Sequence, residues 1–304
     1  MRSTKRVVPL HIRWMSKSPS IQNLSIQNTS LGSEEGQLLL NGLDVYSVPA
    51  SGDDHPLAVY GINSSAEKKD DGKRPPILLL HGRTWSSIPV YHLLGGSPNN
   101  NTKDQSRSLM EALYDAGLQP YAMDFRGFGG TPRDATGFVD PKRCVSDTET
   151  VLKFIHASSN GKLPTLLGWS QGALVAQLVA QKSPQLLSKL TLYGSIYNPN
   201  LFYPRNPLYV EDQKIPSTFT NTTYDAAIED FTIEGSIPPE TAKSFAKAAL
   251  FTDPIKAQWN NLHEFNNCDP ARVLVPTLLV RSSQYRSNVL FLFFLLSVII
   301  PYYT

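Results

Sequence analysis

The sequence predicts an α/β fold in which a mostly parallel sheet is flanked by helices. Short apolar segments alternate with segments of helical periodicity, which is typical of right-handed strand–helix–strand crossovers. Residues 76–80 form a continuous apolar run, as expected for a parallel strand buried on both faces. With 304 residues, 41% of them hydrophobic and 18% charged, the chain has ample material for a buried core.

The predicted strands are short, apolar and bounded by turn residues. In chain order they are residues 43–48, 57–62, 76–80, 120–124, 165–167, 190–193 and 276–280. Helices are predicted between these strands, at 109–116 with Gly117 as the stop, at 147–156, and at 173–182 ahead of Pro184. The strands and helices therefore belong to one domain, which we place at residues 34–280.

The alternation of strands and helices stops between residues 197 and 267. The first part of this segment is rich in proline and reads as loop, and residues 239–250 have helical periodicity. We predict that this segment is an insertion that caps the sheet.

Residues 1–33 differ in composition from the rest of the chain. They are rich in serine and contain no acidic residue but five basic ones: Arg2, Lys5, Arg6, Arg13 and Lys17. This composition is typical of a transit peptide to the mitochondrion or another organelle, and the segment lacks the apolar core of a secretory signal. The alternative is a disordered tail on a cytoplasmic protein.

Charge and cysteine content exclude several classes of protein. A net charge of +2 provides no electrostatic footprint for nucleic acid. The two cysteines, Cys144 and Cys268, lie far apart, which excludes a disulfide scaffold, and no Cys/His spacing indicates zinc. We therefore expect no nucleic-acid partner, no metal and no organic cofactor.

The motif GWSQG at residues 168–172 stands between a predicted strand and a predicted helix. A G-x-S-x-G sequence in that context forms a strained turn that exposes the serine hydroxyl above the sheet. Gly168 and Gly172 permit the tight bend, and the helix N-terminus stabilises negative charge near Ser170. Ser170 is therefore a candidate nucleophile; a structural serine in a tight turn is the alternative.

A second motif, His81–Gly82, follows the strand at residues 76–80. Backbone N–H groups just after such a strand can form an oxyanion hole with the N–H of the residue after the nucleophile. Here these are the N–H groups of Arg83, or of Thr84, and of Gln171. We expect His81 to hold the loop by hydrogen bonds rather than to act as the base.

The glycine-rich segment 124–131, DFRGFGGT, lacks the residues of a phosphate-binding loop and is predicted to have a packing role. HG after one strand, DxRGxGxT after the next and then GxSxG resemble the α/β-hydrolase superfamily, in its single-domain serine esterase and lipase branch. The resemblance covers about residues 57–280. It implies that Ser170 is the nucleophile, that Arg83 and Gln171 form the oxyanion hole, and that residues 197–267 are the cap. A serine at this turn favours acyl-group hydrolysis through an acyl-enzyme over the epoxide-hydrolase and dehalogenase branches, which carry aspartate there.

The chain departs from the family order, in which an acid and then a histidine follow the serine. No Asp or Glu follows Asp269, and no His follows His263. His263 beside Glu264 in the cap is the less favoured candidate for a substitute pair. We therefore expect that the chain is C-terminally truncated, with the last strand and helix of the fold missing. Loss of the histidine would impair turnover, and an uncovered sheet edge would lower stability.

Residues 281–304 form an atypical tail with the apolar run VLFLFFLLSVII at residues 289–300. A membrane-spanning helix needs about 20 residues, so the run is short for one. Our expectation is a truncated product, and a membrane anchor is the alternative.

The sequence thus predicts a serine hydrolase that cleaves an ester, thioester or amide of a small apolar substrate through an acyl-enzyme. Aromatic residues near the motifs and in the insertion favour an apolar substrate: Trp85, Trp169, Phe202, Tyr203 and Phe231. The alternative is a catalytically inactive binding or regulatory form of the fold.

Overall fold

The computed structural model of the chain describes residues 33–63, 74–93, 107–195, 220–230 and 237–280. Its centre is a seven-stranded sheet in the order β1-β2-β6-β3-β7-β8-β9. The strands are β1 Leu43–Pro49, β2 Pro56–Ile62, β3 Pro76–Leu80, β6 Gln119–Met123, β7 Thr165–Trp169, β8 Lys189–Tyr193 and β9 Thr277–Val280. A small second sheet pairs β4 His92–Leu93 with β5 Arg107–Ser108.

Most neighbouring strands of the main sheet are parallel. β1 and β2 form an antiparallel hairpin, and β2 pairs antiparallel with β6. From β6 through β3, β7 and β8 to β9 every pair is parallel. Leu80 at the end of β3 lies opposite Met123 and Gly168, so the carboxyl ends of these strands share one edge of the sheet. That edge is where ligands bind in open α/β sheets.

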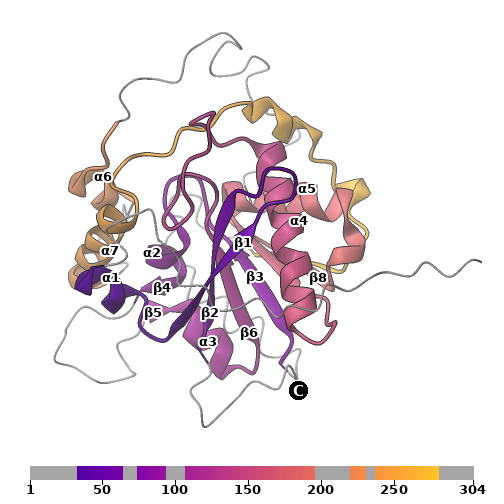
Figure 1. The fold of residues 1–304 in the computed structure, drawn as a ribbon, viewed down its shortest axis with the longest axis horizontal. Helices are drawn as coiled ribbons and strands as arrows, with labels where there is room; N and C mark the ends of the chain where they lie inside the picture. The colour runs from indigo at the N-terminus through magenta and orange to yellow at the C-terminus, as the bar shows by residue number, and fades with distance from the viewer. Residues whose placement is uncertain (1–32, 64–73, 94–106, 196–219, 231–236, 281–304) are drawn as a thin grey trace, which may run out of the picture.

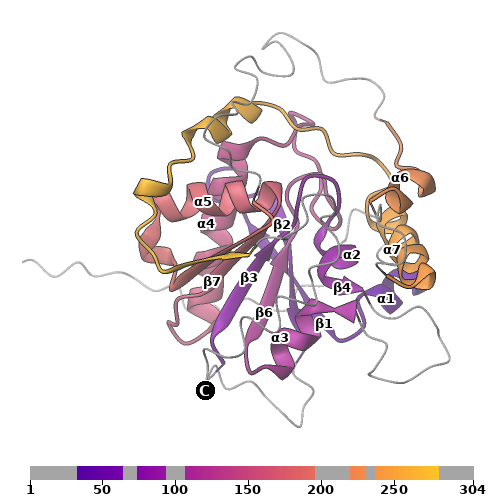
Figure 2. The ribbon, with the colours of Figure 1, turned by 180° about the vertical axis from the view of Figure 1, so that it is seen from behind.

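Helices cover both faces of the sheet (Figures 1 and 2). The longer ones are α3 Leu109–Asp115, α4 Pro141–Ser158, α5 Gln171–Lys182 and α7 Pro239–Thr252, and the shorter ones are α1 Glu34–Leu39, α2 Ser87–Tyr91 and α6 Tyr224–Ile228. One apolar cluster joins Leu78 and Leu80 of β3 to α4 and α5. The other joins Ile77 and Leu79 to α2, α3 and α7. β3 is thus buried on both faces, which explains its continuous apolar sequence.

The predicted alternation and the α/β architecture are confirmed, and the structure extends several of the predicted elements. The helix predicted at 147–156 is α4, and it begins earlier, at Pro141. Asp140 caps it by accepting the Arg143 N–H at 2.8 Å, and proline fits the first helical position. The helix predicted at 239–250 is α7, and it ends two residues later. The helix α2 and the strands β4 and β5 were not predicted, because they are too short to show a period.

The described part of the insertion touches both sides of the sheet. α7 packs on α2, and the chain then passes over the top of the sheet in Figure 1 toward α4 and α5. There the 3-10 helix η4, Leu262–Asn267, packs against these two helices, and Trp259 and Phe265 join the apolar cluster beneath them. The end of the insertion is therefore part of the core.

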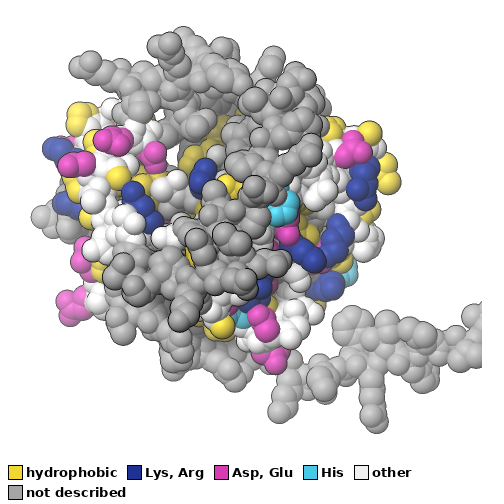
Figure 3. All heavy atoms as spheres, turned by 90° about the horizontal axis from the view of Figure 1, so that it is seen from above, with side chains coloured by type: hydrophobic (Ala, Val, Ile, Leu, Met, Phe, Trp, Pro, Cys, Tyr) yellow, Lys and Arg dark blue, Asp and Glu magenta, His cyan; other side chains and the backbone are white. Residues whose placement is uncertain are grey.

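Some predictions lie outside the described residues. These are the transit peptide, apart from Ser33, and the tail at 281–304. In the described part, β9 is one edge of the sheet, and Leu279 on it is 69% exposed. None of the described helices is both long and apolar enough to cross a bilayer. The face seen in Figure 3 carries positive and negative side chains interspersed with hydrophobic ones.

Candidate active site

Ser170 occupies the turn that links β7 to α5. Its backbone has φ 54° and ψ −118°, a strained conformation for a residue with a side chain. The turn is held on both sides, because the Ser170 N–H donates to the Tyr193 carbonyl at 2.9 Å and its own carbonyl accepts the Ala173 N–H at 3.0 Å. Such over-determined strain is characteristic of functional positions.

Both glycines of the motif are required by close backbone contacts. A Cβ at Gly168 would lie 2.3 Å from the Gly172 carbonyl oxygen. A Cβ at Gly172 would lie 2.3 Å from the His81 carbonyl oxygen and 2.7 Å from that of Leu80. The first turn of α5 therefore lies directly against the end of β3, and only glycine permits this approach.

The structure brings the two sequence motifs together. A Cβ on Gly82 would lie 3.4 Å from the Ser170 Cβ and 3.1 Å from the Trp169 ring. Arg83 and Thr84, the next two residues, are exposed. The N–H groups of Arg83 and Thr84 have no hydrogen-bond partner within the described part of the chain.

Gln171 opens α5 directly after Ser170. A helix N-terminus presents N–H groups that lack intrahelical partners, together with a partial positive charge. The Gln171 side chain is 1% exposed, and its buried Nε2 has no hydrogen-bond partner among the residues that the structure describes. The position of this amide could not be predicted from the sequence, because it depends on the tertiary packing.

His81 holds the loop after β3, as expected from the sequence. Its Nδ1–H donates to the Gly82 carbonyl at 2.9 Å, and its Nε2 accepts the Phe125 N–H at 3.1 Å. Burial lowers its pKa to about 3, so the imidazole is neutral at physiological pH. The rings of Phe125 and Phe128 pack on it at centroid distances of 4.6 and 4.5 Å. With both nitrogens engaged, His81 has a structural role.

No histidine in the described part of the chain is hydrogen-bonded to Ser170. The five histidines that fall in the described ranges are His55, His81, His92, His156 and His263. Glu264, the neighbour of His263, accepts the Lys142 N–H at 2.8 Å, at the start of α4. The carboxylate of the predicted substitute pair is thus engaged with that helix.

Asp124 anchors the glycine-rich turn, which confirms the predicted packing role of that segment. Its Oδ2 accepts the Tyr60 hydroxyl at 2.7 Å and the Gly130 N–H at 3.0 Å, and its Oδ1 accepts the Ser87 N–H at 2.8 Å. Burial raises its pKa to about 6, although these donors oppose the shift. A Cβ at Gly129 would lie 2.1 Å from this carboxylate.

Asp253, at the end of α7, is a second buried carboxylate beside this turn. Its Oδ2 accepts the Ser86 N–H at 2.9 Å and the Ser86 hydroxyl at 2.7 Å, and its Oδ1 accepts the Gly129 N–H at 3.0 Å. Burial raises its pKa above the usual range. Sequence reasoning missed Asp253, because nothing local distinguishes it from a helix-terminal aspartate on the surface.

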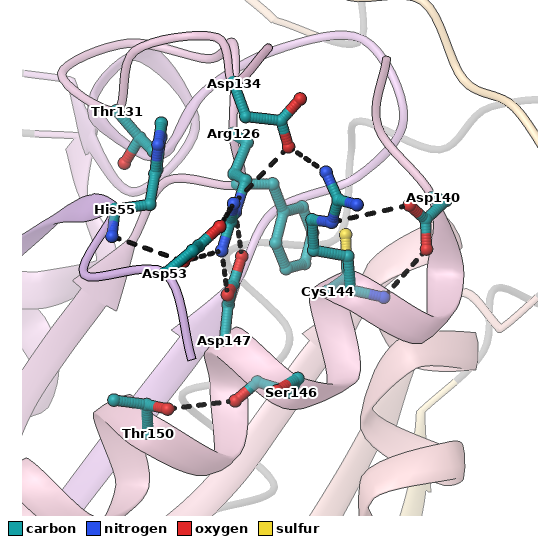
Figure 4. Close-up of polar contacts among 12 residues, drawn as sticks. Asp53, His55, Arg126, Thr131, Asp134, Asp140, Cys144, Ser146, Asp147 and Thr150 are labelled. Atoms are coloured by element: carbon teal, nitrogen blue, oxygen red, sulfur yellow. Dashed lines mark hydrogen bonds and ion pairs between the residues drawn. The ribbon is translucent and has the colours of Figure 1, made fainter. Parts of the chain in front are cut away.

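Arg126 of the same turn is the centre of an ion-pair network. Figure 4 shows three carboxylates around its guanidinium, those of Asp53, Asp134 and Asp147. Arg126 is 5% exposed, and it joins the β1–β2 hairpin to α4. In the residues that the structure describes, no three His, Cys, Asp or Glu side chains form a group suited to a metal ion.

The structure describes only two of the aromatic residues expected to favour an apolar substrate, and it places them differently. Trp85 is 2% exposed, packs edge-on against Phe245 at 5.8 Å and donates its indole N–H to Asp230, so it belongs to the core. Trp169 is half-buried beside Gly82. The others fall outside the described residues: Phe202, Tyr203 and Phe231.

Comparison with solved structures finds the same fold. The thioesterase domain from the curacin biosynthetic pathway matches with a TM-score of 0.52 and 14% identity, over 86% of this chain and 90% of that chain. Naproxen esterase (carboxylesterase NP) from Bacillus subtilis matches with a TM-score of 0.50 and 12% identity, over 94% of this chain and 100% of that chain. At these identities the likeness concerns the fold alone.

A curated relative matches part of the sequence. A probable alcohol acetyltransferase from Saccharomyces cerevisiae is 32% identical over 124 residues, which are 40% of this chain and 30% of that protein. The match thus spans less than a third of the relative's length. A family model described as the alpha/beta hydrolase fold matches residues 75–261, a segment that includes both the Ser170 turn and the loop after β3. Because this match covers more than half of the sequence, the chain belongs to the α/β hydrolase fold family.

Proposed function

We propose that the protein is a serine hydrolase that cleaves an ester, thioester or amide of a small apolar substrate, with Ser170 as the nucleophile. The observation that carries this proposal is the strained backbone of Ser170, fixed between β7 and the N-terminus of α5. If the position served only to form the turn, glycine would adopt the same conformation without strain. A serine that is kept there at the cost of strain therefore favours a role for its hydroxyl. The fold family supports the same chemistry.

In the proposed mechanism the Ser170 hydroxyl attacks the carbonyl carbon of the substrate. The negative charge that develops on the carbonyl oxygen is stabilised by the N–H groups of Arg83 and Gln171. Collapse of this intermediate expels the alcohol, thiol or amine, which takes up a proton, and leaves an acyl group on Ser170. Attack by water then releases the acid and restores the hydroxyl.

The proton of Ser170 needs a base. None of the described histidines is hydrogen-bonded to Ser170. Our proposal therefore assigns the described residues the roles of nucleophile and oxyanion donors, and assigns the role of base to none of these histidines. Activated acyl donors, whose leaving groups need no protonation, are the substrates with which the reaction should be seen.

An alcohol is a second candidate acceptor for the acyl group. The partial match to a probable alcohol acetyltransferase favours it, since transfer to an alcohol uses the same acyl-enzyme as hydrolysis. Adding a short-chain alcohol to the assay distinguishes the two: a transferase yields the new ester, and a hydrolase yields only the acid.

The proposal is tested by labelling the protein with a fluorophosphonate, which reacts with activated serines. We expect one adduct on Ser170 in the wild-type protein and no adduct in S170A. The control S183A should still be labelled, because Ser183 lies at the opposite end of α5 and donates its hydroxyl hydrogen bond to Glu149. A folded wild-type protein that takes up no label would overturn the proposal and favour the non-catalytic binding form.

A further inference from the structure

The loop of residues 81–86, which we call the oxyanion loop, connects β3 to α2. Its only exposed residues are Arg83 and Thr84. Each peptide group in it is planar, so that holding a carbonyl oxygen also fixes the direction of the N–H that follows it. The Gly82 carbonyl is held by His81, which fixes the N–H of Arg83.

The next peptide group is held from a distant part of the sequence. Trp259 donates its indole N–H to the Arg83 carbonyl at 3.0 Å. This hydrogen bond fixes the N–H of Thr84 in the same way that His81 fixes that of Arg83. Trp259 comes from the segment between α7 and η4, 176 residues away in the chain.

Trp259 is itself tightly fixed. It is 3% exposed, and its ring packs against Phe125 at a centroid distance of 6.0 Å, against Phe128 at 6.4 Å and against Phe265 at 6.3 Å. Phe125 and Phe128 also pack on His81. His81 and Trp259, which hold successive carbonyls of the oxyanion loop, therefore pack against the same two rings.

The far end of the oxyanion loop is held by the same insertion. Asp253 binds both the N–H and the hydroxyl of Ser86, and Asp124 binds the N–H of Ser87. Each of these carboxylates also accepts an N–H from the glycine-rich turn, at Gly129 and Gly130 respectively. The ends of the loop thus have little freedom, and the Arg83–Thr84 peptide depends on Trp259.

We propose that Trp259 is a positioning residue for the oxyanion loop: by holding the Arg83 carbonyl, its indole N–H fixes the Thr84 N–H and holds Arg83 on the side opposite the peptide group that His81 fixes, while Asp253 holds the end of the loop. The inference rests on the proposed function of Ser170. It assigns the segment after α7 a role in organising the site, in addition to its role in the core.

The test uses W259F, which keeps an aromatic ring but removes the N–H, and measures two rates. The first is the rate of Ser170 phosphonylation, which we expect to fall about tenfold, since removing an oxyanion donor outright costs about 10²–10³ and misorienting one costs less. The second is the rate of tryptic cleavage after Arg83, which we expect to rise, because the carbonyl that trypsin attacks is the one that Trp259 holds.

The matched control is F265L, which loosens the packing around Trp259 without removing its N–H. F265L should lower the melting temperature but, at a temperature where it is folded, change both rates much less than W259F does. If W259F does not fold, substitution of Trp259 by 3-benzothienylalanine removes the N–H from a ring of nearly the same shape.

W259F with wild-type rates of both labelling and cleavage would overturn the inference. If wild-type protein takes up no label, the proposed function fails, and the cleavage rates alone decide the role of Trp259.

Discussion

Replacement of Arg126 by methionine is expected to remove a large part of the protein's stability. The guanidinium donates to Asp147 through Nε and Nη2, at 2.8 Å each, and to Asp53 at 2.5 and 3.1 Å. Methionine fills a similar volume but donates no hydrogen bond. The carboxylate of Asp147, only 3% exposed, would then be buried without its partner.

The expected loss is determined mainly by Asp147. Removing one partner of a buried ion pair costs about 3–5 kcal/mol, because the remaining charge stays desolvated. Asp53 adds little, since its side chain is 51% exposed and water screens it, and Asp134 keeps Arg143 as a partner. We therefore expect a loss of about 3–4 kcal/mol at neutral pH. The corresponding fall in Tm is about 10 °C for a domain of this size.

Urea unfolding of wild type, R126M and the double variant R126M/D147L at pH 7 and pH 5 checks this reasoning. Burial already raises the pKa of Asp147, and without Arg126 it rises further, so protonation at pH 5 should relieve part of the loss. The double variant removes the unpaired charge and should regain more than half of the stability. A loss below about 1 kcal/mol in R126M, or a larger loss at pH 5 than at pH 7, would refute the account.

Three other predictions follow from the site and its supports. S170G should relieve the strained φ and raise the stability by about 1 kcal/mol while abolishing labelling, and a stability equal to that of S170A would contradict it. G172A should prevent folding or cost about 3 kcal/mol, seen as loss of soluble protein, because its Cβ meets the His81 carbonyl; wild-type yield and melting temperature would contradict it. Burial raises the folded-state pKa of Asp124 to about 6 from 3.8, so the folded state binds this proton more tightly. Urea titrations should therefore show wild type gaining stability relative to D124N as pH falls from about 7 to 4, and the opposite trend would contradict the assignment.

Much of the fold was predictable because its signals are local. The run at 76–80, the motif GWSQG and the helix at 173–182 all lie within short windows, and their order alone predicts a parallel sheet with Ser170 at its carboxyl edge. The start of α4 is encoded locally by Asp140 followed by Pro141, a capping signal that lies outside the apolar period at residues 147–156.

The support of the site was not predictable, because it comes from contacts between distant parts of the chain. Trp259 and Asp253 lie in a segment that the sequence predicts only as an insertion, and their partners, Arg83 and Ser86, are 176 and 167 residues away. Whether a tryptophan is a core residue or donates to a loop depends on the packing of the whole domain. No local pattern in the sequence reveals such a pair.

The central claim is that Ser170 forms an acyl-enzyme, and the most direct test is to look for that species. The protein is mixed with p-nitrophenyl butyrate, quenched in acid and digested, and the peptides are analysed by mass spectrometry. The account predicts a butyryl group on the peptide that contains Ser170, with p-nitrophenol released in equal amount and no such peptide from S170A. A folded wild-type protein that carries no acyl group on Ser170, or carries it equally on other serines, would contradict the account.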